Sequence, residues 1–197
     1  MEEVRERIIQ SAAQMFIQHG YEGATTRLIA VAAQVNEVTI FRQFGNKENL
    51  FMEAVERYLL LPGIDAVLRG PLSGDTHQDL QLVARYYLAA VMKNRRAVLM
   101  AYTEAQRSVE VRRFVARSAQ RQRQLLGKYL RQQVELGAVR VLPDPELAAH
   151  SFLGMLMAYA LNQILLEEIT LPKSVDEVIG QIVDLFLKGI EEKRNEP

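Results

Sequence analysis

The sequence predicts an all-α protein of about nine helices, with an N-terminal three-helix helix-turn-helix domain and a larger C-terminal helical bundle. Three observations predict this fold class. Apolar residues recur at helical spacing through most of the 197 residues, and no strand-like alternation bounded by turn residues occurs. Proline and glycine are sparse, at 6 and 11 residues. Since 49% of the residues are hydrophobic, the chain can also build a sizeable core.

The first three helices are expected within the first 44 residues. Apolar positions at helical spacing predict a helix over residues 2–19, and Gly20 is suited to end it in a left-handed conformation. A second helix is expected to begin at a threonine cap and to end at about Ala33. After a three-residue turn, Asn36 is expected to cap a short third helix over 37–44, whose first turn carries an acidic residue, as the helix dipole favours.

Six further helices are expected to fill most of the remaining chain. Their ends are predicted by glycines, prolines and polar caps, such as Asn46, Pro62 and Pro145. The expected ranges are 47–59, 77–93, 95–107, 109–136, 145–167 and 174–194.

Composition excludes several classes of site. The chain has no cysteine, so a disulfide, a catalytic thiol and a zinc-thiolate site are ruled out. Its three histidines are far apart in sequence, and we expect no metal and no cofactor. The formal net charge is zero, so any DNA contact must come from a few placed groups. The basic stretch 93–133 is expected to be a solvated helix face, with an anionic effector as the alternative.

A membrane location is not expected. The first residues are charged, unlike a secretory signal peptide. The segment 147–166 has no formal charge and is long enough to span a bilayer, but polar residues interrupt it. We therefore expect a helix buried on most sides there, and a cytoplasmic protein without a membrane partner.

The first quarter of the chain carries the strongest functional signal. Two helices joined by a short turn are typical of a helix-turn-helix, whose second helix lies in the major groove of DNA. Over about its first 51 residues the chain resembles the TetR family of transcriptional regulators, named for the tetracycline repressor. The matching residues are Ile8, Ile9, Ala12, Ala13, Phe16, Gly20, Tyr21, Thr25, Thr26, Ile29, Ala30, Ala33, Val35, Phe41, Phe44, Lys47, Glu48, Leu50 and Phe51.

The resemblance implies a DNA-binding domain over residues 1–51 and a ligand-binding and dimerisation domain over 52–197. Carried over by position, Thr26 and Lys47 would contact phosphates, and Val38 would pack on a thymine methyl group. The expected DNA-binding residues are Thr26, Arg27, Asn36, Val38, Thr39, Phe41, Arg42, Gln43 and Lys47. The family usually has glycine at the position of Gln34, so a positive φ there would carry a small local cost.

In the resemblance, the last two helices pair with those of a second chain, and the helices before them enclose a ligand. The expected interface residues are Phe152, Leu156, Tyr159, Ile182, Leu185 and Phe186, with the monomer core as the alternative for each. The expected pocket residues are Tyr58, Tyr86, Tyr87, Met100, Tyr102, Phe114, Met155, Tyr159 and Asn162. Such side chains also occur commonly in helical cores.

The expected function is that of a homodimeric, ligand-responsive repressor. It would bind a palindromic double-stranded DNA operator and be released from it by a small apolar or aromatic effector. No catalytic residues are expected, because no nucleophile–base pair or phosphate-binding glycine loop is present in the sequence. Two alternatives remain open at this point: a helical enzyme or carrier that uses the C-terminal pocket, and a constitutive DNA-binding protein without a ligand.

Overall fold

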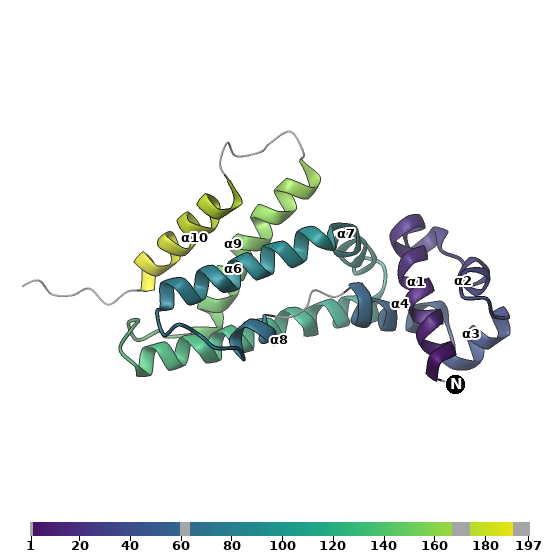
Figure 1. Cartoon of the computed structure of the whole chain (residues 1–197), viewed down its shortest axis with the longest axis horizontal. Helices are drawn as coiled ribbons and strands as arrows, with labels where there is room; N and C mark the ends of the chain where they lie inside the picture. The colour runs from purple at the N-terminus through teal and green to yellow at the C-terminus, as the bar shows by residue number, and fades with distance from the viewer. Residues whose placement is uncertain (1, 60–63, 167–173, 191–197) are drawn as a thin grey trace, which may run out of the picture. The chain divides into compact units, whose positions relative to one another are not determined.

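A computed structural model describes residues 2–59, 64–166 and 174–190 of the chain. Within these residues all regular secondary structure is helical, in ten α-helices and one π-helical turn, η1 (Figure 1). The all-α fold class is therefore confirmed. The chain divides into two compact units: unit 1 comprises residues 1–60 and 94–117, and unit 2 comprises residues 61–93 and 118–197.

Unit 1 contains the first four helices, η1, α7 and the beginning of α8. Their bounds are α1 Glu2–Gly23, α2 Thr26–Ala32, α3 Glu37–Phe44, α4 Lys47–Ala54, η1 Val55–Leu59, α7 Arg95–Glu104 and α8 Val109–Glu135. The predicted third helix is confirmed with the same bounds. The predicted fourth helix continues from α4 into η1, a change of winding that the sequence pattern did not indicate.

The core of unit 1 forms around α1, which packs against α2, α4 and α7. Three aromatic rings connect the end of α1 to α4. The Phe16 ring meets the Phe51 ring edge-on at 4.9 Å between centroids, and the Tyr21 ring lies 5.0 Å from that of Phe51. Gly20 has φ 69°, so the left-handed end predicted for the first helix is confirmed, although helical residues continue to Gly23.

Unit 2 contains α5, α6, α9, α10 and the greater part of α8. The bounds of the first four are α5 Asp65–Leu68, α6 Thr76–Lys93, α9 Pro145–Leu165 and α10 Val175–Ile190. Helix α6 packs against α5, α9 and α10. The four-residue helix α5 was not predicted, and the end predicted for the last helix at 194 lies outside the described residues.

Two buried features fix the packing of unit 2. The Asp79 carboxylate, 2% exposed, accepts hydrogen bonds from the Ser73 amide and hydroxyl, both at 2.8 Å, and from the Tyr129 hydroxyl at 2.9 Å. Burial, and after it the hydrogen bond to Asp79, raises the pKa of Tyr129. On the same helix α8, a Cβ at Gly127 would lie 3.0 Å from Cγ and 3.2 Å from Cα of Glu146, so a larger residue there would require the start of α9 to shift by a few tenths of an ångström.

Helix α9 contains most of the uncharged segment that the sequence analysis singled out. Its residues Phe152 and Leu156 are fully buried inside unit 2. Among the described residues, no helix is both long and apolar enough to cross a membrane.

The turn between α2 and α3 contains the single non-glycine residue of the described chain with positive φ, Gln34 at 53°. Its amide donates to the Val31 carbonyl at 3.1 Å, and the next amide, of Val35, donates to the Ala30 carbonyl at 3.0 Å. The side chain of Gln34 is exposed. The backbone bonds of the turn thus hold a conformation in which the Cβ of a residue other than glycine is strained.

We expect the substitution Gln34→Gly to raise the free energy of unfolding by about 0.5–1 kcal/mol, because the strain relieved exceeds the added flexibility of the unfolded chain. Thermal unfolding of the full chain measures the change. The control is Gln34→Ala, which retains a Cβ and should leave the melting temperature near that of the parent. A clear loss of stability in the glycine variant would show that the glutamine side chain has a structural role.

Candidate nucleic-acid interface

Side-chain caps define where the helices of the helix-turn-helix begin. The Thr25 hydroxyl accepts a hydrogen bond from the Leu28 amide at 3.2 Å at the start of α2. The Asn36 Oδ1 atom accepts one from the Val38 amide at 2.9 Å at the start of α3. Each cap satisfies one amide that the helix itself leaves free, so α3 begins at a fixed residue.

Helix α3 has one buried side and one exposed side. Ile40 and Phe44 are buried against the core of unit 1, whereas Val38 is 70% exposed and Phe41 is 48% exposed. Arg42 is also exposed, in the last turn of the helix. The solvent-facing side therefore offers two apolar groups and one guanidinium, which is a chemistry suited to base edges and methyl groups in a DNA groove.

A hydrogen bond connects the first residues of α2 and α3. The Thr26 hydroxyl donates to the Glu37 carboxylate, and both side chains are half-buried. Because its proton is used in this bond, the Thr26 hydroxyl has no proton left for a phosphate, and the Thr26 backbone amide is the donor that stays available. The sequence suggested Glu37 as a first-turn residue but did not reveal its bond to Thr26.

The ammonium group of Lys47 lies 4.4 Å from the centroid of the Tyr21 ring and donates to the Glu22 carbonyl at 3.4 Å. Burial lowers the pKa of Lys47 below its ordinary value. Burial, with Glu48, Glu104 and Glu22 adding to it, raises the pKa of Tyr21 to about 12. Lys47 is therefore a held cation at the start of α4, not a freely extended side chain.

Arg7 of α1 holds the turn of the helix-turn-helix in place. Its Nε atom donates to the Ala33 carbonyl at 2.8 Å, at the C-terminal end of α2. The carbonyls at a helix end lack partners within the helix, and a cation is favoured there by the helix dipole. Arg7 was not among the predicted site residues, because its partner is a backbone atom 26 residues away.

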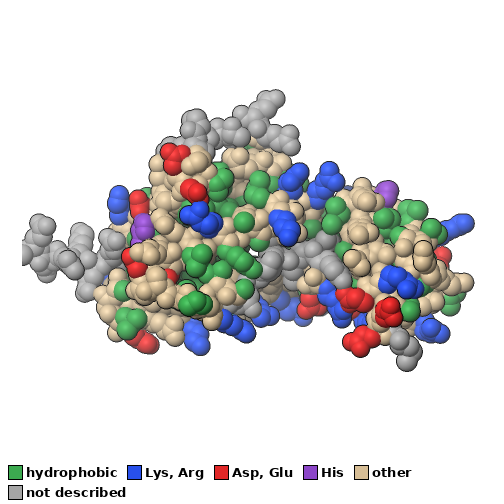
Figure 2. Space-filling model, in the orientation of Figure 1, with side chains coloured by type: hydrophobic (Ala, Val, Ile, Leu, Met, Phe, Trp, Pro, Cys, Tyr) green, Lys and Arg blue, Asp and Glu red, His purple; other side chains and the backbone are tan. Residues whose placement is uncertain are grey.

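The remaining predicted DNA-binding residues differ in exposure. Arg27 is exposed, Thr39 is half-buried, and Gln43 is half-buried with its Oε1 atom enclosed and without a hydrogen-bond partner. On the face shown in Figure 2, acidic and basic side chains both lie on unit 1. No single basic patch covers that face, which agrees with the zero net charge of the chain.

The predicted pocket residues belong to both units. Tyr87 is buried and Tyr86, Met155 and Tyr159 are half-buried in unit 2, where Asn162 is exposed.

The other predicted pocket residues belong to unit 1. Met100 and Phe114 pack against the core of that unit, and Tyr102 is 44% exposed. The side chain of Tyr58 lies outside the described residues.

The predicted interface residues divide into core and surface. Phe152 and Leu156 are fully buried and Phe186 is 8% exposed, with 5.0 Å between the ring centroids of Phe152 and Phe186. These three side chains are part of the core of unit 2. Tyr159 and Ile182 are half-buried.

Of that set, Leu185 is the most exposed, at 67%. A stripe of α9 at helical spacing is also exposed in the single chain, and we call it the α9 stripe. It consists of Leu147, Ser151, Gly154, Ala158, Asn162 and Leu165.

Among the described residues, no group of three or more histidine, aspartate or glutamate side chains is placed to hold a metal ion. Several polar groups of the helix-turn-helix are engaged in caps and interhelical hydrogen bonds.

Two family models match the chain. The model of bacterial regulatory proteins of the tetR family matches residues 8–54, and the model of the C-terminal domain of AefR-like transcriptional repressors matches residues 78–189. The chain is 26% identical to the uncharacterized HTH-type transcriptional regulator YvkB of Bacillus subtilis over 190 residues, which are 96% of this chain and 98% of YvkB.

Solved structures share the fold. A TetR transcription regulator from Haloarcula marismortui superposes with a TM-score of 0.78 at 16% identity, over 98% of this chain and 100% of that one. The regulator FadR from Bacillus subtilis, in complex with stearoyl-CoA, superposes with a TM-score of 0.74 at 17% identity, over 94% of this chain and 99% of FadR.

The cap made by Asn36 gives a stability prediction that is separate from any DNA contact. We expect Asn36→Ala to lower the free energy of unfolding by about 1 kcal/mol, because the Val38 amide loses its acceptor. Asn36→Ser restores an acceptor and should unfold close to the parent temperature. Thermal unfolding of the three proteins in the absence of DNA measures both effects. Equal stability of the alanine and serine variants would contradict a capping role.

Proposed function

Because the chain belongs to the TetR family of bacterial regulatory proteins, we propose that it is a homodimeric repressor that binds a palindromic DNA operator and releases it when a small effector binds. The observation that carries this proposal is the exposed side of α3. There a capped helix turns Val38, Phe41 and Arg42 to solvent while its opposite side is buried in the core of unit 1. A packed helical corner without a DNA role would not require large apolar side chains at those exposed positions.

We assign two roles to the DNA-facing groups. Val38, with Thr39 beside it, is the base-reading residue, since its methyl groups are free to meet the methyl group of thymine. Arg27 and the first amides of α2 are the phosphate-binding groups, which fix the position of the protein but not the sequence it reads. Arg42 lies on the same exposed side of α3 and would reach either a phosphate or a guanine.

A dimer is required because a palindromic operator is read by two recognition helices one helical turn of DNA apart, about 34–36 Å. We propose that the α9 stripe and Leu185 of α10 form the contact between the two chains. Gly154 and Ala158 would let two helices approach closely, and a Cβ built at Gly154 meets no atom within 4 Å in the single chain. Exposed leucines lie at both ends of the stripe, Leu147 at 59% and Leu165 at 61% exposure.

We propose that the effector binds in unit 2 and is small and apolar or aromatic. Tyr86, Met155 and Tyr159 are the half-buried predicted pocket residues there, and thioether and aromatic groups adapt to apolar ligands. FadR, whose fold is similar, carries stearoyl-CoA, a ligand with a long apolar chain. The effector would act by favouring a state in which the recognition helices are wrongly spaced, and α4 with η1 is the proposed lever.

Titration of duplex DNA from the upstream region of the gene tests this function. Saturable, salt-sensitive binding to a palindrome is expected, and loss of that binding when an apolar effector is added is expected to follow. The absence of specific binding even at low salt would overturn the proposal. Specific binding that no effector weakens would instead favour a constitutive repressor.

Substitutions at Val38 and Arg27 should separate base reading from phosphate binding. We expect Val38→Ala to weaken operator binding about tenfold and to leave non-specific binding and the salt slope unchanged. Arg27→Gln should weaken both kinds of binding and reduce the salt slope by about one. Fluorescence anisotropy with an operator duplex and a scrambled duplex, over a series of salt concentrations, measures these effects. A change of salt slope in the valine variant would contradict the assigned roles.

Gly154→Glu should convert the dimer to a monomer, because two buried carboxylates would face each other across the proposed contact. Glutamate favours a helix more than glycine does, so the variant chain should remain folded. The control is Ala119→Glu, at an exposed position of α8 outside the α9 stripe, which should leave the assembly intact. Size-exclusion chromatography with light scattering measures the mass. A dimeric Gly154→Glu protein would exclude α9 as the interface.

A further inference from the structure

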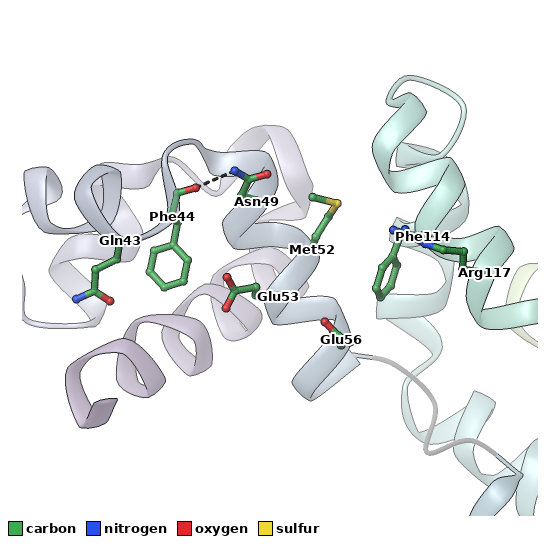
Figure 3. Close-up of a pocket in the computed structure, with 8 residues that line it drawn as sticks. All are labelled: Gln43, Phe44, Asn49, Met52, Glu53, Glu56, Phe114 and Arg117. Atoms are coloured by element: carbon green, nitrogen blue, oxygen red, sulfur yellow. Dashed lines mark hydrogen bonds between the residues drawn. The ribbon is translucent and has the colours of Figure 1, made fainter. Parts of the chain in front are cut away.

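Unit 1 contains a cleft that the proposed function does not use. Its volume is about 300 Å³, which is at the small end of the roughly 300–1,000 Å³ typical of ligand sites. Figure 3 shows that its lining comes from the last turn of α3, from α4 and η1, and from the first turns of α8. The lining residues are Gln43, Phe44, Asn49, Met52, Glu53, Glu56, Phe114 and Arg117.

One of the two carboxylates in the lining is already neutralised. The Glu53 carboxylate accepts a hydrogen bond from Arg5 Nη2 at 2.5 Å, and the Arg5 guanidinium lies 4.4 Å from the centroid of the Phe44 ring. Arg5, a residue of α1, therefore supplies the ion-pair partner of the Glu53 carboxylate. Glu53 contributes little net charge to the cleft.

The other two charged lining groups have opposite signs and are unpaired. Within the described residues, neither Glu56 nor Arg117 makes a hydrogen bond or an ion pair, and both side chains are exposed. The carboxylate comes from η1 and the guanidinium from α8 (Figure 3). A third polar group, the enclosed Oε1 atom of Gln43, also lacks a donor.

The apolar part of the lining comes from the same elements as these charges, α4 with η1 and α8. Met52 and Phe114 are half-buried and point toward the same opening in Figure 3. A thioether and an aromatic ring can hold an apolar or aromatic side chain of variable shape. A ligand that matches the whole lining thus carries an ammonium group, a carboxylate and one apolar substituent.

We propose that this cleft binds a small zwitterion, namely a free α-amino acid with an apolar or aromatic side chain. The ligand ammonium group pairs with the Glu56 carboxylate, and the ligand carboxylate pairs with the Arg117 guanidinium in the two-pronged geometry that arginine offers. The side chain packs on Met52 and Phe114. The site is separate from the effector site proposed in unit 2, and its occupancy can be measured on the protein without DNA.

The position of the cleft gives its ligand direct access to the recognition helix. Gln43 and Phe44 are the last two residues of α3, and both line the cleft. A bound amino acid would contact the same turn that carries Arg42. The ligand would therefore act on the DNA-reading helix without passing through unit 2.

Three matched probes test the charge requirement by isothermal titration calorimetry on the full chain without DNA. L-phenylalanine carries both charges, 2-phenylethylamine only the ammonium group, and 3-phenylpropanoate only the carboxylate. We expect L-phenylalanine to bind at least about tenfold more tightly than either of the other probes, since each lacks one charge-assisted contact. No binding of L-phenylalanine, or equal binding of one of the singly charged probes, would overturn the proposal.

Two substitutions and one control locate the site. Arg117→Met and Glu56→Gln should each weaken L-phenylalanine binding about tenfold or more. Arg113→Met, one helical turn earlier on α8 and outside the cleft, should bind like the parent protein. Circular dichroism melts confirm that each variant is folded.

Methyl NMR of the methionines gives a readout that does not depend on the substitutions. The Met52 methyl signal should shift on titration with L-phenylalanine, whereas the signals of Met155 and Met157 in unit 2 should not. Shifts confined to the methionines of unit 2 would place the amino acid elsewhere and overturn the proposal.

Discussion

The helix-turn-helix of unit 1 depends on burial of one side of α1. Ile8, Ile9, Ala12 and Phe16 of that helix are fully buried. Helices α2, α3 and α4 have only 7, 8 and 8 residues, well below the roughly 12–15 residues at which an isolated helix is marginally stable in water. Their helical conformation is therefore maintained by tertiary packing. The exposed side of α3 keeps its shape only because the opposite side is packed into the core that α1 organises.

The polar side chains of the helix-turn-helix mainly serve its own structure. Asn36 caps α3, Thr26 is bound to Glu37, and Lys47 is held over the Tyr21 ring. Intramolecular bonds at these positions fix the two helix N-termini relative to each other. The backbone amides there are then pre-positioned for a phosphate, which binds well at helix N-termini. In the proposed function, sequence readout falls to exposed side chains that make no such bonds, such as Val38 of α3.

Local signals explain which elements the sequence predicts well. The bounds of α3 match because an asparagine cap precedes it and Gly45, with φ 79°, ends it. The π-helical turn η1 and the four-residue helix α5 have no comparable signal, because their conformation depends on packing and not on a cap or a period. Residues 94–117 belong to unit 1 because of their contacts in the folded chain. The spacing of apolar residues along the sequence does not reveal those contacts.

The same limit applies to the candidate sites. The sequence resemblance points to α3 as the proposed DNA-reading helix, but it does not show that Thr26 and Asn36 are engaged within the protein. In α9 the apolar positions extend around most of the helix, so large side chains such as Phe152 and Leu156 do not indicate which side is buried. The structure buries those two residues together with Ala149 and Ala160, and leaves Gly154, Ala158 and the leucines at both ends of the α9 stripe exposed. The buried side of α9 is set by its packing against α6 and α10, which residue size alone does not indicate.

Residues 94–117 contribute to the packing of unit 1, which supports α3, the proposed DNA-reading helix. Ser108 accepts a hydrogen bond from the Val111 amide at 3.1 Å, which caps α8, and its hydroxyl donates to the Glu48 carboxylate in the first turn of α4. The starts of α8 and α4 are thus joined through one hydroxyl group. Helix α7, just before this junction, packs on α1 and carries Glu104, which is 5% exposed and whose pKa is raised by burial. Displacement of the first turn of α8 must therefore either break the bond between Ser108 and Glu48 or carry with it the start of α4, where Lys47 is held.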